Sequence, residues 1–370
     1  MSDREEPGRS NAFRLSGRQW MGLALFSLAL YILVPAAWRR VEPLEMGPDY
    51  RLPYEFNSDY WLWSRAAAQA AATHETVVLG DSVVWGVYVK PGETLSHYLN
   101  AQEGRDRYAN LGINGAQPVA LAGLVDYYGG AIRGKRVLIQ CNPLWMSSPK
   151  RDLREDEEYA FFHQALTPQF FPSIPCYKET VSNRIGKIFD RTSPLHGWTT
   201  HLQLAYFGEG ETPRTIPKWT LDHPYEDPLK VVTGKLPGPA DAGREEPVPW
   251  TTRGITRDNM PWVDLAGSIQ WKSFLRTVEI LQQRGNSVLV LVGPFNEHLL
   301  KEPSRVKYRE LKRGIEDGLR ERKIPYVAPD ALPSDFYGDA SHPLGAGYAL
   351  LAKELVAGGF LADAESKPER

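Results

Sequence analysis

The chain has 370 residues, of which 42% are hydrophobic, and its 43 lysines and arginines nearly balance its 45 aspartates and glutamates. This is the composition of an ordinary globular protein, and it lacks the basic footprint expected of a nucleic-acid-binding one. Two cysteines, Cys141 and Cys176, exclude a disulfide framework, although a single bridge between them remains open. Scattered histidines without ligand spacing predict no metal site, and they include His163, His196, His201 and His223. No cofactor is implied.

An uncharged apolar stretch at residues 20–38 is about long enough to cross a bilayer as a helix. The arginines before it outnumber the pair that follows, which favours a cytoplasmic amino terminus. We therefore expect a cytoplasmic tail at 1–19, a transmembrane anchor at 20–38 and the bulk of the chain outside. A cleaved signal peptide is the main alternative, because Val34-Pro35-Ala36-Ala37 offers small residues for a peptidase. A buried helix of a soluble protein is the third possibility.

Beyond the anchor, residues 39–74 are expected to form a stalk followed by an alanine-rich helix at 64–73. Strands and helices then alternate over a catalytic domain at 75–360, which a flexible tail at 361–370 follows. The expected strands cover 76–79, 107–111, 136–141, 287–292 and 325–328, and the expected helices cover 94–101, 118–128, 267–284, 305–322 and 346–357. This alternation predicts an α/β fold with a mostly parallel, doubly wound sheet.

The alternation disappears between the third and fourth strands, at residues 143–266. Aromatic and proline-rich sequence replaces it, such as Phe170-Phe171-Pro172 and Pro247-Val248-Pro249-Trp250. The segment is too long for an ordinary connection and leaves the carboxyl end of the third strand. We expect a cap or a substrate-binding insertion there. A poorly ordered loop without a role is the alternative, especially at 234–246.

Two short segments far apart in the chain carry the chemistry. Gly80-Asp81-Ser82 follows the apolar strand 76–79, so Ser82 should lie at the carboxyl end of a strand, where open α/β sheets keep their active sites. Asp339-Ala340-Ser341-His342-Pro343 supplies a base and an orienting carboxylate three residues apart. A serine hydroxyl is a poor nucleophile until such a base removes its proton. The two segments together predict acyl chemistry.

Two further blocks complete a sequence order. Asn110-Leu111-Gly112-Ile113-Asn114-Gly115 follows the second predicted strand, and Cys141-Asn142-Pro143 follows the third. With the two segments above, they resemble the four blocks of the SGNH/GDSL hydrolase superfamily, which contribute Ser, Gly, Asn and His in that order. The resemblance covers about residues 75–145 and 285–357. It implies a flavodoxin-like doubly wound parallel sheet with a long insertion after the third strand.

The resemblance also implies the role of each residue. Ser82 would be the nucleophile, His342 the general base and then acid, and Asp339 the carboxylate that orients the imidazole. The backbone N–H groups of Ser82 and Gly115 and the side-chain amide of Asn142 would hold the oxyanion. This chain departs from the family at the third block, where Gly-x-Asn-Asp is usual and Gln140-Cys141-Asn142-Pro143 stands here.

Each of these assignments has a competitor in the sequence. Ser82 could cap a helix, and His342 could be a surface-loop histidine. The remaining alternatives are Asp335 in place of Asp339, Gly112 in place of Gly115, a turn role for Asn142 before proline, and a substrate contact by Asn296 or Glu297, which we leave out of the catalytic set.

The anchor and the four blocks together indicate a membrane-anchored serine esterase or O-acyltransferase that acts on an acylated carbohydrate or lipid of the cell envelope. It is similar to the accessory proteins that work beside membrane-bound O-acyltransferases, such as those that acetylate alginate or move D-alanine to teichoic acid. A membrane-bound O-acyltransferase is therefore an expected partner. Two alternatives remain open: a catalytically silent envelope scaffold on the same fold, and a soluble lipase-like enzyme whose signal peptide is removed.

Overall fold

The computed structural model describes residues 15–167, 174–208, 212–236 and 246–359. The chain is an α/β protein whose five parallel strands form one sheet in the order β2-β1-β3-β4-β5. The strands are β1 (Thr76–Leu79), β2 (Tyr108–Asn110), β3 (Arg136–Cys141), β4 (Ser287–Val292) and β5 (Tyr326–Val327). The bounds of β1, β3 and β4 are the predicted ones. Buried parallel strands are recognisable in sequence because they are continuous apolar runs.

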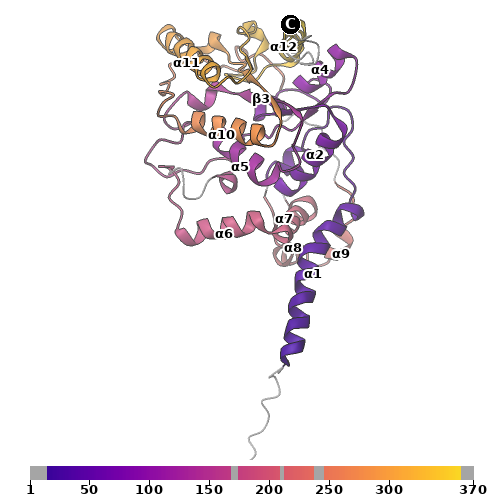
Figure 1. Cartoon of the computed structure of the whole chain (residues 1–370). Helices are drawn as coiled ribbons and strands as arrows, with labels where there is room; N and C mark the ends of the chain where they lie inside the picture. Colours follow the sequence, from indigo (N-terminus) through magenta and orange to yellow (C-terminus); the bar gives the residue numbers. More distant parts are fainter. Residues whose placement is uncertain (1–14, 168–173, 209–211, 237–245, 360–370) are drawn as a thin grey trace, which may run out of the picture.

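Helices precede and follow the strands along the whole chain (Figure 1). They are α1 (Gly17–Val41), α2 (Tyr60–Thr73), α3 (Ser82–Trp85), α4 (Leu95–Glu103), α5 (Pro118–Tyr128), α6 (Val181–Thr192), α7 (Pro194–Phe207), α8 (Ile216–Asp222), α9 (Pro228–Val231), α10 (Ile269–Gln283), α11 (Glu302–Glu321) and α12 (Gly345–Ala357). Helix α2 begins four residues before its predicted start, because the carboxylate of Asp59 caps it by accepting the Leu62 N–H at 2.8 Å.

Successive strand residues point into two separate cores. Val77 and Val137 pack in one core with apolar residues of α2, α5, α10 and α11. Val78 and Leu138 pack in the other with residues of α4 and α12. Helices therefore cover both faces of the sheet, as the predicted doubly wound arrangement requires. The strand order reverses between β1 and β3, and the carboxyl ends of the strands at such a point are where open α/β sheets bind ligands.

Within residues 39–74, expected as a stalk and a helix, the first residues end α1, and the part from Leu52 onward packs into the first core. Leu62, Trp63 and Ala66 of α2 are buried there, and the Trp63 indole donates to the Leu111 carbonyl oxygen at 3.2 Å. The described residues of the insertion at 143–266 carry four α-helices, α6 to α9, where the sequence showed no regular pattern. Both cysteines are buried free thiols, so the bridge left open by the sequence is absent.

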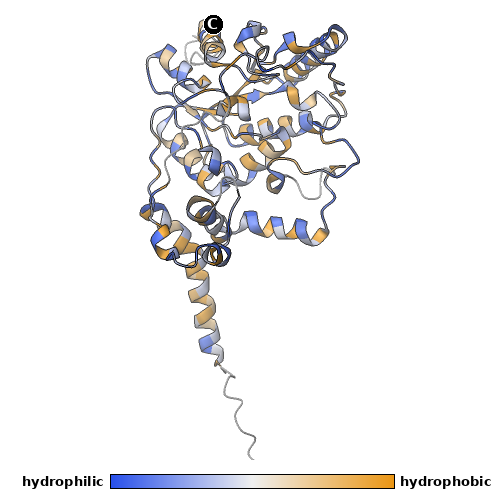
Figure 2. Cartoon of the chain, turned by 180° about the vertical axis from the view of Figure 1, so that it is seen from behind, coloured by the Kyte–Doolittle hydropathy of each residue, from blue (hydrophilic) through white to orange (hydrophobic). Residues whose placement is uncertain are grey.

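Helix α1 is long and apolar enough to cross a membrane, and only 6% of its most apolar window is buried. That exposure argues against the core helix of a soluble protein. In Figure 1 the first turns of α1 project away from the body, and Figure 2 colours most of that ribbon as hydrophobic. Residues 1–14 of the cytoplasmic tail predicted at 1–19, Phe170-Phe171-Pro172, residues 237–245 of the expected loop and the predicted tail at 361–370 lie outside the described residues.

Candidate active site

Ser82 lies at the first residue of α3, immediately beyond the carboxyl end of β1. The helix is capped by Asp81, whose carboxylate accepts the Val83 N–H at 2.9 Å. The capping role that the sequence allowed for Ser82 therefore belongs to its neighbour, and the Ser82 hydroxyl is left for another partner. A β-carbon on Gly80 would lie 2.4 Å from Val84 Cγ2, so the tight turn into α3 requires glycine.

His342 is the partner of that hydroxyl. Its Nε2 lies 2.8 Å from Ser82 Oγ, although the two residues are 260 positions apart in the chain. Its Nδ1 lies 2.8 Å from both carboxylate oxygens of Asp339. With Nδ1–H donating to the carboxylate, the lone pair of Nε2 faces the serine. The structure thus brings the three predicted residues into the geometry of a Ser-His-Asp triad.

Asp339, not Asp335, contacts the histidine. The Asp339 carboxylate accepts the backbone N–H groups of Ser341 and His342 at 2.9 and 3.0 Å, so its orientation is fixed by its own loop. Asp335 is exposed to solvent in a short 3₁₀ turn, Ser334–Phe336. Local backbone geometry therefore decides between two carboxylates that the sequence left as rivals.

The contacts between Asp339 and His342 favour an ionised Asp339 and make His342 more basic. Burial alone would raise the pKa of Asp339, but the charge of His342 and the hydrogen bonds from its ring and loop hold that pKa well below its usual range. Burial alone would lower the pKa of His342, but the charge of Asp339 and its hydrogen bond, together with the charge of Asp81, raise it above the ordinary value. The histidine is thus a stronger base than a free imidazole.

The loop after β2 distinguishes between the two candidate oxyanion glycines. The N–H of Gly112 donates to Asn110 Oδ1 at 2.9 Å, and a β-carbon there would lie 2.4 Å from the Trp85 nitrogen. Gly112 therefore serves close packing. The N–H of Ile113 also has a partner, the Gly80 carbonyl oxygen at 3.1 Å. Among the hydrogen bonds of the described residues, the Gly115 N–H donates none.

Gly115 has a φ of 76°, in the left-handed region that favours glycine. A β-carbon on it would lie 3.1 Å from the ring of Phe162, which belongs to the insertion. His163, next to that phenylalanine, is bound through Nε2 to the Asn114 carbonyl oxygen at 2.7 Å. This part of the insertion therefore lies against the loop that carries Gly115, while the cap expected from sequence stays a prediction.

Asn142 is tied to the first block through Asp81. Its Nδ2 donates to Asp81 Oδ2 at 2.8 Å, and its Oδ1 accepts the Leu144 N–H at 3.0 Å. The residue therefore begins a turn, as the sequence alternative held, while the second N–H of its amide makes no hydrogen bond within the described residues and could reach an oxyanion. The Trp145 indole also donates to Asp81, at 2.6 Å. Burial raises the pKa of Asp81 despite these donors.

The chain matches no protein-family model and no curated protein. The roles proposed for Ser82, His342 and Asp339 therefore rest on their geometry and on the order of the four blocks.

Sequence reasoning missed the residues that support the histidine loop. The Tyr88 hydroxyl donates to Asp339 Oδ2 at 3.1 Å, and its ring meets the His342 ring edge-on at 5.5 Å. The Arg253 guanidinium of the insertion lies over the Tyr88 ring at 4.4 Å. No short motif marks such contacts, because they join segments far apart in sequence.

Asn296 also supports this loop. Its Nδ2 donates to the Asp339 carbonyl oxygen at 3.0 Å, and its backbone N–H donates to the Ala340 carbonyl oxygen at 2.8 Å. The residue is completely buried, so its position at the end of β4 serves to hold the loop in place. The only signal in the sequence was that location after a predicted strand.

Proposed function

We propose that the protein is a serine esterase or O-acyltransferase of the SGNH type. The observation that carries this proposal is the continuous Ser82–His342–Asp339 hydrogen-bonded chain at the carboxyl ends of parallel strands. The strand order β2-β1-β3-β4-β5 supports it, because this is also the order of flavodoxin-like sheets. The four blocks occur at the ends of β1, β2 and β3 and before α12.

The chemistry proceeds in two balanced halves. Ser82 Oγ attacks the carbonyl carbon of an ester while His342 Nε2 takes the hydroxyl proton, and the developing oxyanion is held by N–H donors of Ser82, Gly115 and Asn142. Collapse breaks the ester bond, and His342 returns the proton to the leaving alcohol. The acyl group then stays on Ser82 as an ester. Water or an acceptor hydroxyl attacks it next, with His342 again acting as base and then acid.

The helix α1 supports an envelope substrate. In this proposal α1 anchors the chain with its amino terminus in the cytoplasm, and the catalytic domain acts outside on an acylated carbohydrate or lipid. A membrane-bound O-acyltransferase would supply the acyl group to Ser82, and aromatic side chains of the insertion would suit stacking against sugar faces. The second half-reaction then determines whether the enzyme hydrolyses or transfers.

The test uses the full-length chain in lipid nanodiscs with an aryl acetate as substrate and a fluorophosphonate as covalent probe. We expect Ser82→Ala and His342→Ala each to lower turnover by about 10⁴-fold or more, with probe labelling lost in Ser82→Ala. Ser182→Ala, an exposed serine of α6, serves as the matched control and should keep both signals. Wild-type turnover that survives both triad changes would exclude the proposal.

A wild-type chain that is folded but neither turns over the ester nor reacts with the probe would instead favour the silent scaffold. Mass analysis of products with and without a carbohydrate acceptor separates the two enzymatic outcomes. An acylated acceptor indicates transfer, and free acid alone indicates hydrolysis.

A further inference from the structure

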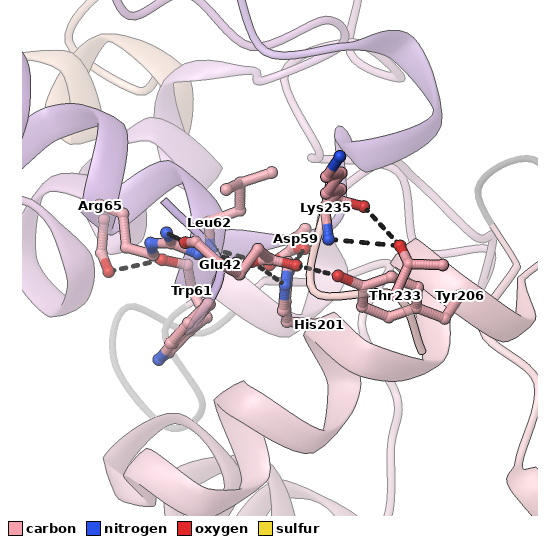
Figure 3. A network of polar contacts seen from close by, with 10 residues as sticks. Glu42, Asp59, Trp61, Leu62, Arg65, His201, Tyr206, Thr233 and Lys235 are labelled. Carbon is pink, nitrogen blue, oxygen red and sulfur yellow. Dashed lines mark hydrogen bonds and ion pairs between the residues drawn. The ribbon is translucent and has the colours of Figure 1, made fainter. Parts of the chain in front are cut away.

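Helix α1 ends in a buried ionic cluster where it enters the body. Its C-capping residue, Glu42, is completely buried and lies 2.7 Å from Arg65 Nη1 and 2.9 Å from His201 Nε2 (Figure 3). The other ring nitrogen of His201 lies 2.6 Å from Asp59 Oδ2. Two carboxylates thus face two cations without contact with solvent. The cluster ties the end of α1 to α2 and α7, and removing one partner of such a buried pair is strongly destabilising.

The last turns of α1 pack against the insertion. Pro35 is buried, and Trp38 meets Trp198 of α7 with ring centroids 5.9 Å apart. The α1 side chains are largely exposed from Trp20 to Leu33. At 1.5 Å per residue, that exposed part spans roughly 21 Å, whereas the hydrocarbon core of a bilayer is about 30 Å thick. A membrane crossed by α1 must therefore extend up to the level of Trp38, where α7 already packs against the helix.

Exposed apolar side chains gather at that level. Outside α1, the described residues include nine large hydrophobic side chains that are exposed, and seven of them lie between residues 181 and 229. These seven are Val181, Ile185 and Phe189 of α6, Ile216 and Leu221 of α8, Tyr225, and Leu229 of α9. In Figure 1, α8 and α9 flank α1 and α6 runs across the same end of the body.

The α6 residues form one stripe. Val181, Ile185 and Phe189 follow each other at intervals of four, so they lie along one side of the helix. Basic residues occupy the packed side: Lys187 pairs with Glu179, and the Arg191 guanidinium lies over the Tyr127 ring. A face with apolar residues outward and charges inward is the reverse of what water favours.

We propose that α6, α8 and α9 lie in the interface of the bilayer that α1 crosses, so that the insertion seats the domain on lipid. The inference rests on the membrane span proposed above. Near α8 and α9 the exposed Lys218 and Lys230 are offset by Asp222, Glu226 and Asp227. Because these charges nearly cancel, burial of the apolar side chains provides the binding, and an uncharged lipid suffices. The distance from Ser82 to the membrane is then set by the insertion.

The experiment places single fluorescent labels on the full-length chain in phosphatidylcholine nanodiscs. The labelled variants are Ile185→Cys and Leu229→Cys at the proposed interface, Leu25→Cys within the span, and two exposed controls, Val306→Cys on α11 and Asn183→Cys about half a turn around α6 from Ile185. The native thiols are buried, and unlabelled wild type sets the background. Nitroxide-bearing lipids then quench the labels that touch the bilayer.

We expect quenching at Ile185 and Leu229 to be at least twofold stronger than at Val306 and Asn183. High salt should leave the quenching at Ile185 and Leu229 unchanged, because apolar burial provides the binding. Strong quenching at Leu25 together with weak quenching at Ile185 and Leu229 would overturn the proposed contact of α6, α8 and α9 with the bilayer while leaving the span intact. Weak quenching at Leu25 would overturn the membrane span, and with it the proposed bilayer contact of α6, α8 and α9. Neither result bears on the triad, whose test is separate.

Discussion

Two histidines of this protein face carboxylates, His201 in a completely buried setting and His342 in a partly buried one. His201 has a carboxylate at each ring nitrogen, Asp59 at Nδ1 and Glu42 at Nε2. His342 has a carboxylate at Nδ1 only, and a neutral hydroxyl faces its Nε2. Burial opposes the charged form of both rings, and in both the neighbouring carboxylates outweigh it. The pKa of His201 rises to about 9, and that of His342 rises as well.

The number of carboxylates decides what each ring can do. His201 is protonated at neutral pH and both of its N–H groups are used, so it acts as a fixed cation between two anions. His342 keeps one nitrogen for a proton that arrives from Ser82, which is what a general base requires. A histidine beside an acidic residue is therefore a candidate catalyst only when its second nitrogen faces a group that has a proton to give.

The largest expected effect on this difference comes from changing Asp339, the carboxylate of the proposed triad. Asp339→Asn should lower kcat by about 10⁴-fold, because the amide no longer selects the tautomer with Nε2 free. Asp335→Asn, a neighbouring exposed carboxylate, is the matched control and should keep wild-type turnover. Ester hydrolysis with an aryl acetate measures both. Equal losses in the two variants would show that the loop, and not the Asp339 charge, matters.

The second prediction concerns the proposed oxyanion donors beside Ser82, which a histidine that acts only as a fixed cation does not need. Asn142→Ala should lower kcat by about 10²- to 10³-fold with a smaller effect on KM, as expected for a donor used mainly in the transition state. Asn114→Ala, which keeps the backbone of the oxyanion loop, is the control. Thermal unfolding of both variants checks the fold, since Asn142 also contacts Asp81. A change in KM alone would argue for ground-state binding instead.

The charge of His201 should contribute to the free energy of unfolding in a pH-dependent way. Because the folded-state pKa of His201 lies above its unfolded value of about 6.5, its contribution is fully present below that pH and is lost as pH rises through about 9. The expected loss is of order 3 kcal/mol. Denaturant unfolding of wild type and His201→Gln at several pH values measures it. The stability gap between them should shrink across this window, and a constant gap would contradict a charged His201.

The smallest effect concerns the pH profile of the triad. The raised pKa of His342 predicts an acid limb of kcat/KM with its midpoint above the ordinary value of 6.5. Asp339→Asn removes the charge that contributes most to raising this pKa, so the midpoint of the residual activity should move to lower pH. Asp335→Asn should leave it in place. An acid limb that does not respond to Asp339 would assign the titration to another group.

Much of the fold was readable because it depends on local pattern. The bounds of β1, β3 and β4, and those of α5, agree with the predictions, since buried parallel strands are continuous apolar runs and Pro118 marks a helix start. The helices of the insertion were not predicted. Helix α6 has its apolar stripe on the exposed side, so its pattern does not mark a buried face.

The sequence by itself determined the four blocks and their order, and it predicted the type of chemistry, because the proposed reacting groups lie in short motifs at strand ends. Tertiary structure decided which Asp faces His342, which glycine has an uncommitted N–H and where Glu42 meets His201. The first two choices follow from loop geometry that residue types alone do not specify, and the last joins segments 159 positions apart, which only the packed chain brings together.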